Sequence, residues 1–466
     1  MREQKEHSAT RTKSYDETRS LFAPTVDPKA RNESAVLVGV GLNRDTQESV
    51  ERSLDELADL ADTAGAIVVD RVMQRRSRIV GATYIGKGKL EELRELVEEK
   101  EIRLVIFDND LSPAQGKNLE TRLKTKVIDR SELILDIFAT HAQTDTAKLQ
   151  VELAQLEYAM PRLTKLWDHL SRLGGGIGTR GPGETQLEVD RRKVRDRIGR
   201  LKKELERFET SRMVQRKARR KHTTASLVGY TNAGKSTLLN AIAGSRVYVA
   251  DELFATLDTT SRVVELDKDY DIIVSDTVGF IRKLPHKLIE SFRATLSEVQ
   301  ESDFLIHVVD ASNDDAEQQI ETVKKVLEEL GVQEKPVILV LNKADRAPDA
   351  FQQNYLLNKF GPGLVASAKT GQGLDELLGE MRTQAIMGSR VVDLCFPVKE
   401  SGRVSTVHRE GEVLAEKYGS EVILMRARLP HVWAERFAKL GFVADGDVDY
   451  GDAEDATDKA NASPEE

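Results

Sequence analysis

Residues 229–236 constrain the fold of this chain more than any other segment. They read Gly-Tyr-Thr-Asn-Ala-Gly-Lys-Ser, which matches the phosphate-binding pattern G-x-x-x-x-G-K-S. The run 225–228 predicts a strand before the loop, and 237–243 predicts a helix after it. In this strand–loop–helix context, backbone N–H groups can wrap around phosphates. We expect contacts to a nucleotide from Gly229, Tyr230, Thr231, Asn232, Ala233, Gly234, Lys235 and Ser236.

Two side chains of this loop have distinct expected roles. Lys235 should reach the β- and γ-phosphates, and the Ser236 hydroxyl should coordinate Mg²⁺. The loop therefore predicts a Mg²⁺-dependent nucleotide site in a doubly wound α/β domain.

Three further motifs follow in the order that a guanine-nucleotide-binding domain requires, each at the end of an apolar strand. They are Asp276, Thr277, Val278 and Gly279; Asn342, Lys343, Ala344 and Asp345; and Ser367, Ala368 and Lys369. Asp276 should support the metal, and the Gly279 amide should bond the γ-phosphate. A carboxylate at Asp345 can accept from both the N1–H and the 2-amino group of guanine. Adenine lacks both donors, so Asp345 should select guanine.

The other residues of the 342–345 motif and the 367–369 motif have supporting roles. The Asn342 amide should brace the loop, and the Lys343 stem should cover the face of the base. Residues 367–369 should supply a backbone N–H to the guanine O6. Together with Asp345, these residues predict GTP and GDP as the ligands.

The spacing of the switch I segment leaves its Mg²⁺ ligand open. Thr256, Thr259 and Thr260 all lie between the phosphate-binding loop and the strand that ends at Asp276. Any of the three could bind the metal when GTP is present.

Phe280 occupies the position after Asp-x-x-Gly where many regulatory GTPases have a water-orienting Gln. A phenylalanine can neither donate nor accept a hydrogen bond, so we expect slow intrinsic hydrolysis that a partner stimulates. His286 and Arg282 are alternative water-orienting groups, although ordinary surface roles are favoured for both.

The rest of the chain divides into segments of different character. We expect disorder at 1–34, a small α/β domain at 35–137, an antiparallel helical hairpin at 138–221, the nucleotide domain at 222–390, a small α+β domain at 391–443 and a disordered acidic tail at 444–466. Alternating apolar strands and amphipathic helices support the first α/β domain. Its Gly-Lys-Gly-Lys turn at 86–89 is best read as a surface turn that opens a helix.

The hairpin prediction comes from two heptad patterns around a glycine-rich tip. Apolar residues recur at intervals of 4 and 3 over 149–170 and again over 194–208, and Pro161 should kink or interrupt the first arm. The tip, 174–183, contains six glycines and Arg180. Because a heptad helix precedes it, its G-x-G-x-x-G pattern is not a dinucleotide fingerprint.

Charge is distributed unevenly along the chain. Residues 191–221 hold fifteen Lys and Arg against four acids, whereas 445–466 hold nine acids and one Lys. A basic return arm is typical of contact with a phosphate-rich partner, although a solvated helix face has the same composition. One cysteine excludes a disulfide framework, and no stretch is long and apolar enough for a membrane span. We therefore expect a cytoplasmic, monomeric protein without membrane insertion.

Several of these motifs together resemble the HflX family of the Obg–HflX superfamily. The resemblance rests on 229–237, the Leu-Phe-Ala-Thr-Leu-Asp segment 253–258, 276–280, 342–345 and the tip with its continuation, 174–188. It extends over about 35–440 and implies a GTPase with catalytic roles for Lys235, Thr256 and Gly279. It also implies that Thr256 is the switch I ligand of Mg²⁺, within the GTP-contacting segment Phe254, Ala255, Thr256, Leu257 and Asp258.

The same resemblance implies a partner and an action. HflX-type GTPases bind the large ribosomal subunit (50S) and its rRNA, with the hairpin tip directed toward the peptidyl-transferase region, and split stalled or idle ribosomes. The alternative is a signalling or scaffold G-protein whose coiled-coil hairpin binds other proteins. An ATP-driven RNA helicase acting through the N-terminal domain is less favoured, because the sequence holds no second G-x-x-x-x-G-K-S loop.

Overall fold

A computed structural model describes residues 33–43, 45–162, 182–219, 223–244, 253–254, 259–267, 270–283, 293–347, 350–387 and 389–444. The chain forms two compact units. Unit 1 comprises Met1–Phe208 with Ala250–Asp258 and Val278–Thr295, and unit 2 comprises Glu209–Val249, Thr259–Thr277 and Leu296–Glu466. Two short segments from the middle of the nucleotide domain therefore group with the N-terminal part of the chain.

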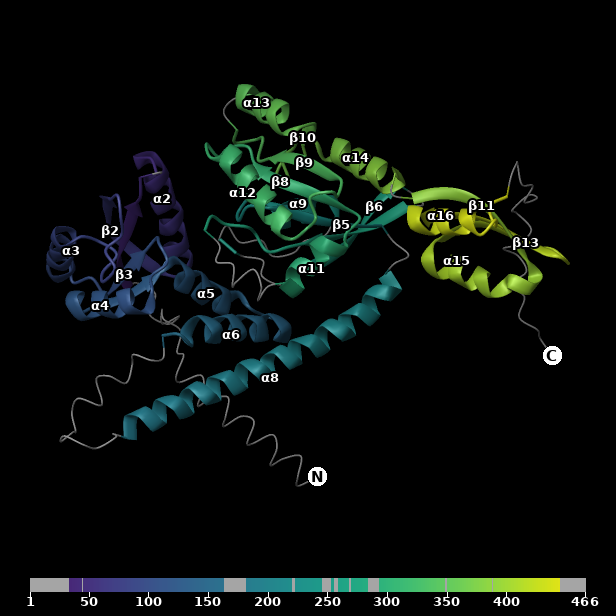
Figure 1. Ribbon diagram of the computed structural model, residues 1–466. Helices are drawn as coiled ribbons and strands as arrows, with labels where there is room; N and C mark the ends of the chain where they lie inside the picture. The colour runs from purple at the N-terminus through teal and green to yellow at the C-terminus, as the bar shows by residue number, and fades with distance from the viewer. Residues whose placement is uncertain are drawn as a thin grey trace, which may run out of the picture. The chain divides into compact units, whose positions relative to one another are not determined.

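Unit 1 begins with a four-stranded parallel sheet of order β2-β1-β3-β4. Helices α3 and α4 pack on one face of this sheet and α2 and α5 on the other (Figure 1). The elements are β1 (Glu33–Gly41), α2 (Gln47–Thr63), β2 (Ala66–Arg75), α3 (Lys87–Glu99), β3 (Leu104–Phe107), α4 (Pro113–Leu123), β4 (Lys126–Asp129) and α5 (Arg130–His141).

Two further helices form a hairpin, as the heptad patterns predict. Helix α6 (Asp145–Ala159) packs its apolar residues against the middle of α8 (Pro182–Arg219), and the buried seam comprises Leu153, Leu156, Val194, Leu201 and Leu205. The Arg197 guanidinium adds a bidentate ion pair with Glu152 at 2.7 Å. Helix α6 ends at Ala159, just before Pro161, so the expected interruption of the first arm is present. The glycine-rich tip lies outside the described residues.

Unit 2 contains a six-stranded sheet of order β10-β9-β8-β5-β7-β6, in which only β6 runs antiparallel to its neighbour. Its elements are β5 (Thr223–Gly229), α9 (Lys235–Ile242), β6 (Thr260–Asp267), β7 (Tyr270–Asp276), α11 (Arg293–Glu301), β8 (Phe304–Asp310), α12 (Ala316–Glu329), β9 (Val337–Asn342), α13 (Ala350–Phe360), β10 (Gly363–Val365) and α14 (Leu374–Met387).

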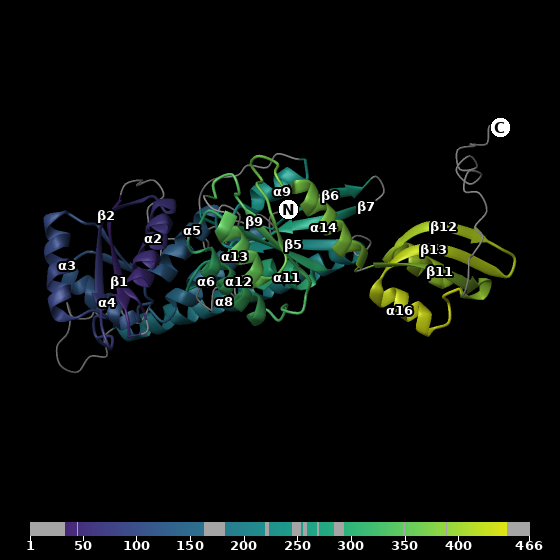
Figure 2. The same cartoon turned by 90° about the horizontal axis from the view of Figure 1, so that it is seen from above.

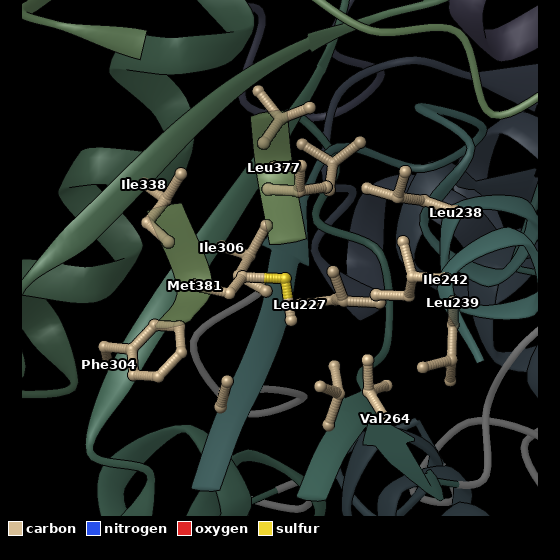
Figure 3. Packing of buried hydrophobic residues seen from close by; sticks show 14 of the residues in the cluster. Leu227, Leu238, Leu239, Ile242, Val264, Phe304, Ile306, Ile338, Leu377 and Met381 are labelled. Carbon is tan, nitrogen blue, oxygen red and sulfur yellow. The ribbon is translucent and has the colours of Figure 1, made fainter. Parts of the chain in front are cut away.

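Helices cover both faces of this sheet, which confirms the predicted doubly wound fold. Figure 3 shows Leu238 and Ile242 of α9 and Met381 of α14 converging on strand residues such as Leu227 and Ile306. On the other face, α12 and α13 pack on β8 and β9. The strand before the phosphate-binding loop, β5, lies in the middle of the sheet, so its carboxyl end opens at the centre of the domain edge.

The last part of unit 2 is a three-stranded antiparallel sheet of order β11-β13-β12 with helices on one face (Figure 2). Its elements are β11 (Ser389–Pro397), a 3₁₀ turn (Val398–Arg403), α15 (Val404–Glu410), β12 (Glu412–Tyr418), β13 (Val422–Pro430) and α16 (His431–Lys439). Phe437 is buried and Trp433 packs against the same core. Among the described residues, no helix combines the length and apolar character of a membrane span.

Candidate functional site

The phosphate-binding loop joins β5 to α9 at the centre of the six-stranded sheet. Gly234 has φ +89°, a left-handed conformation that an L side chain rarely adopts, and Gly229 has φ +151°. A Cβ on Gly229 would lie 2.2 Å from the Val308 carbonyl oxygen. Asn232 is exposed and has φ +57°. Both glycines of the motif are therefore required by the path of the backbone.

Lys235 is folded back inside the loop. Its side chain is buried, and Nζ donates to the carbonyls of Tyr230 at 2.8 Å and Gly229 at 3.2 Å. Burial lowers the pKa of Lys235 to about 8, although the Asp276 carboxylate opposes this shift. The ammonium group is thus poorly solvated and suited to an anion such as a phosphate.

Ser236 and Asp276 form the part of the site suited to a metal. The Ser236 hydroxyl donates to Asp276 Oδ2 at 2.5 Å, and Asp276 is 1% exposed. Hydroxyl and carboxylate oxygens are the hard donors that Mg²⁺ prefers, so these residues fit that ion. The neighbouring Thr277 hydroxyl donates to the Leu227 carbonyl at 2.6 Å, which ties the end of β7 to β5.

Asn342 braces the loops as the sequence predicts. Its Nδ2 donates to the Ala233 carbonyl at 2.9 Å, and its Oδ1 accepts from the Ala368 N–H at 3.0 Å. One side chain at the end of β9 therefore joins the phosphate-binding loop to the 367–369 motif. The Ala344 N–H adds a bond to the Ala366 carbonyl at 3.1 Å.

Asp345 and Lys343 are each held by a partner. The Ser367 hydroxyl donates to Asp345 at 2.6 Å, and this hydrogen bond keeps the pKa of the carboxyl below its usual range. Asp345 is thus a carboxylate at neutral pH, the form that accepts from guanine. Lys343 pairs with Asp310 at the end of β8, a residue that the motif analysis missed. Its place at a strand end beside the loops is the signal that could have identified it.

The structure describes only part of the predicted set of site residues. Tyr230, Thr231, Val278 and Gly279 are buried, whereas Lys369 is exposed. Residues 255–258, with the candidate ligand Thr256, lie outside the described residues, as does His286.

Phe280, which stands where many GTPases have a water-orienting Gln, is 2% exposed. Arg282 is turned to Glu56, 3.9 Å away. The structure thus gives Arg282 an ion-pair partner in the N-terminal α/β part.

A family model agrees with the guanine-nucleotide motifs of the site. Three family models match successive parts of the chain: "GTP-binding GTPase N-terminal" at 51–139, "GTP-binding GTPase Middle Region" at 141–219 and "50S ribosome-binding GTPase" at 224–343. A GDP complex of a GTP-binding protein from the archaeon Sulfolobus solfataricus covers 76% of this chain and 99% of its own, with 26% identity and a TM-score of 0.40.

Curated relatives align along most of the chain. GTPase HflX of Lacrimispora saccharolytica is 46% identical over 424 residues, which is 90% of this chain and 98% of that relative. GTPase HflX of Escherichia coli is 41% identical over 412 residues, 87% and 96% of the two chains. With this likeness and the guanine-nucleotide motifs assembled at one sheet edge, the chain belongs to the HflX family and is a GTPase.

Proposed function

We propose that this GTPase binds the 50S subunit and its rRNA, splits or recycles stalled or idle ribosomes, and hydrolyses GTP faster when bound there. The observation that carries the proposal is the exposed cationic face of α8. The match to a family described as "50S ribosome-binding GTPase" supports it. We further propose that the protein is a cytoplasmic monomer. Its chain would divide into the six segments whose bounds are given above.

Helix α8 has cations on the side opposite its apolar seam. Leu201 and Leu205 are buried in the hairpin, whereas Lys193, Arg200 and Arg207 are exposed. These three are seven residues apart, which places them about 10 Å from one another along one face of the helix. Such a row can contact successive phosphates of an RNA strand, and those contacts weaken steeply with salt.

The proposed hydrolysis uses the residues around the phosphate-binding loop. Lys235 and the Gly279 amide would stabilise charge on the γ-phosphate, and Ser236 and Thr256 would hold Mg²⁺, with Asp276 accepting from Ser236. The ion would neutralise negative charge on the phosphates. Phe280 gives the attacking water no hydrogen bond. The ribosome would therefore supply the missing positioning, and turnover without it would be slow.

The test is GTP turnover by the full chain, alone and with isolated 50S subunits, at about 50 mM and about 200 mM salt. We expect large stimulation at low salt and loss of stimulation in the triple variant Lys193→Glu, Arg200→Glu, Arg207→Glu. Unstimulated turnover should stay unchanged. The matched control reverses three exposed lysines elsewhere, Lys87→Glu, Lys325→Glu and Lys399→Glu, and should keep the stimulation.

Two outcomes would contradict the proposal. Stimulation of the α8 triple variant equal to that of the wild type would remove the cationic face from the interaction. Fast hydrolysis without ribosomes would instead favour the signalling or scaffold alternative, with GTP hydrolysis as a timer. Splitting itself is measured separately, as the conversion of 70S ribosomes to subunits in a sedimentation profile with GTP.

A further inference from the structure

Helix α5 begins with two adjacent residues that bind different parts of unit 1. The first is Asp129, the N-cap of the helix, which accepts from the Glu132 N–H at 3.0 Å. Its carboxylate also accepts from the Tyr158 hydroxyl at 2.6 Å and from Arg162 at 3.1 Å. Tyr158 lies on α6, and Arg162 follows it. Asp129 therefore ties the start of α5 to the first arm of the hairpin, which lies next to it (Figure 1).

The second residue, Arg130, belongs to a buried ionic cluster. Its side chain is 1% exposed and donates to Asp108 at 2.6 and 3.0 Å and to the Ser53 carbonyl at 2.9 Å. The cluster also receives the switch II segment, which we define as 278–283. Lys283 forms an ion pair with Asp108, and the Arg282 carbonyl accepts from Arg130 at 3.4 Å.

The switch I segment meets the same helix two turns further along. Phe138 of α5 and Phe254 pack edge to face, with ring centroids 4.7 Å apart and an interplanar angle of 79°. Both rings are at least 98% buried. Phe254 lies two residues before Thr256, the proposed switch I ligand of Mg²⁺. Helix α5 thus contacts both the switch I segment and the switch II segment. These are the two segments from which we expect contacts to Mg²⁺ and the γ-phosphate.

Both contacts hold backbone that is otherwise unfavourable. Phe254 has φ +58° and Lys283 has φ +55°, left-handed conformations that residues with a Cβ seldom adopt. Such conformations persist when the surroundings impose them. The aromatic contact with Phe138 holds Phe254, and Lys283 is held by its ion pair with Asp108 and by donating to the Ser53 hydroxyl at 3.1 Å. A nucleotide state that moves either switch segment must therefore weaken the contact between that segment and unit 1 residues around α5.

We propose that α5 couples the nucleotide state of the switch segments to the hairpin. At the start of α5, Asp129 binds the first arm of the hairpin, and its neighbour Arg130 binds the switch II segment. Coupling of this kind is reciprocal, so a change at the α6 end must alter the preference between GDP and GTP. This inference needs only guanine-nucleotide binding and does not rest on the proposed ribosomal role.

The test is a double-mutant cycle on the full chain. Tyr158→Phe removes the hydroxyl that Asp129 accepts from and keeps the ring on which the Arg162 guanidinium stacks at 3.6 Å. Lys283→Met removes the switch II cation. The readout is the ratio of Kd values for GDP and a non-hydrolysable GTP analogue, since a general loss of stability leaves this ratio unchanged. Tyr418→Phe, at an exposed tyrosine on β12, is the matched control.

We expect Tyr158→Phe and Lys283→Met each to shift the ratio at least about threefold, in the same direction. The Tyr158→Phe shift should largely disappear in the Lys283→Met background, and Tyr418→Phe should have no effect. Arg162→Met provides a second change at the α6 end, at a partly exposed side chain. Unchanged ratios in both Tyr158→Phe and Arg162→Met, or additive effects with Lys283→Met, would overturn the proposal.

Discussion

The Lys343 ammonium lies 2.8 Å from the Asp310 carboxylate, at the carboxyl ends of the neighbouring strands β9 and β8. Lys343 has φ +61°, and the two side chains are 19% and 15% exposed. Asp310 is fixed in turn, because it accepts from the Ser312 N–H at 3.0 Å and from the Ser312 hydroxyl at 2.6 Å. Asp310 therefore positions the lysine whose stem we expect to cover the guanine.

Replacing Asp310 with Asn should weaken binding of GDP and GTP by about 3- to 10-fold. The loss of one partly buried charge-assisted contact is worth about 1 kcal/mol. The turnover number should change little, since Asp310 touches no reacting group. Asp314→Asn, the same change at an exposed residue nearby, is the control. Fluorescence titration with a labelled GDP measures both, and wild-type affinity in Asp310→Asn would remove the positioning role.

Gly234→Ala should abolish nucleotide binding while the fold is retained. A Cβ at this position would lie 2.4 Å from Asn342 Nδ2, and φ is +89°. The methyl group would therefore displace the amide that braces Ala233 and Ala368. We expect at least a hundredfold loss of GDP affinity by calorimetry, with an unchanged circular dichroism spectrum.

Gly379→Ala is the matched control for that substitution. Gly379 lies within α14, and no atom comes within 4 Å of a Cβ built there. Alanine favours a helix over glycine by about 1 kcal/mol, so this variant should bind GDP normally and unfold at a slightly higher temperature. Normal GDP binding by Gly234→Ala would show that the Asn342 brace is dispensable.

The nucleotide loops were predictable because each motif combines a fixed spacing with a strand end. The Asn342 brace follows from the sequence pattern alone, whereas the hydrogen bond between Ser236 and Asp276 was not predicted. Helix α5 was not predicted, and the expected domain boundary at 137 falls inside it. Its residues 133–138 are nearly all apolar and buried on every side. Such a run has no amphipathic period from which a helix can be recognised.

The contacts of α5 were also beyond the reach of sequence patterns. Asp108, Arg130 and Lys283 lie far apart in the chain, and nothing in their local sequence distinguishes them from surface charges. Only the fold brings them into one cluster. Asp310 differs, because its place at the end of an apolar strand is a local signal, although only the fold shows that its partner is Lys343.

Nucleotide binding should weaken as the pH rises through about 8. Burial lowers the pKa of Lys235 to about 8 in the nucleotide-free protein, and phosphates must raise it again. Below that pKa the lysine is already charged, so affinity is flat. Above it, binding requires proton uptake, and affinity should fall by up to about tenfold per pH unit.

Calorimetry in two buffers of different ionisation enthalpy measures this proton uptake directly. The number of protons taken up per GDP should be near zero at about pH 7 and should rise clearly by about pH 8.5. Lys343→Arg is the control, because it alters another lysine of the site and should leave the uptake at pH 8.5 in place. Equal uptake at both pH values would contradict the assignment to Lys235.

His307 should make the nucleotide domain sensitive to acid. It is 2% exposed on β8, and its Nε2 has no hydrogen-bond partner among the described residues. Burial, with Lys324 and Lys235 nearby, lowers its pKa to about 3. Below about pH 6.5 the unfolded chain binds a proton at this residue and the folded chain does not. Stability should therefore fall by about 1.4 kcal/mol per pH unit between about pH 6.5 and about pH 3.

His307→Leu removes both the unpartnered nitrogen and this proton uptake. We expect the variant to gain about 1 to 3 kcal/mol at pH 7 and about 2 kcal/mol more at pH 5. Urea unfolding at the two pH values measures the change, followed through the transition that GDP shifts, since ligand binding stabilises only the domain that binds it. The change in unfolding free energy between pH 7 and pH 5 is compared between wild type and His307→Leu. The carboxylates contribute equally to both changes, so the comparison isolates the histidine. The same pH difference in wild type and His307→Leu would mean that His307 can be protonated within the fold.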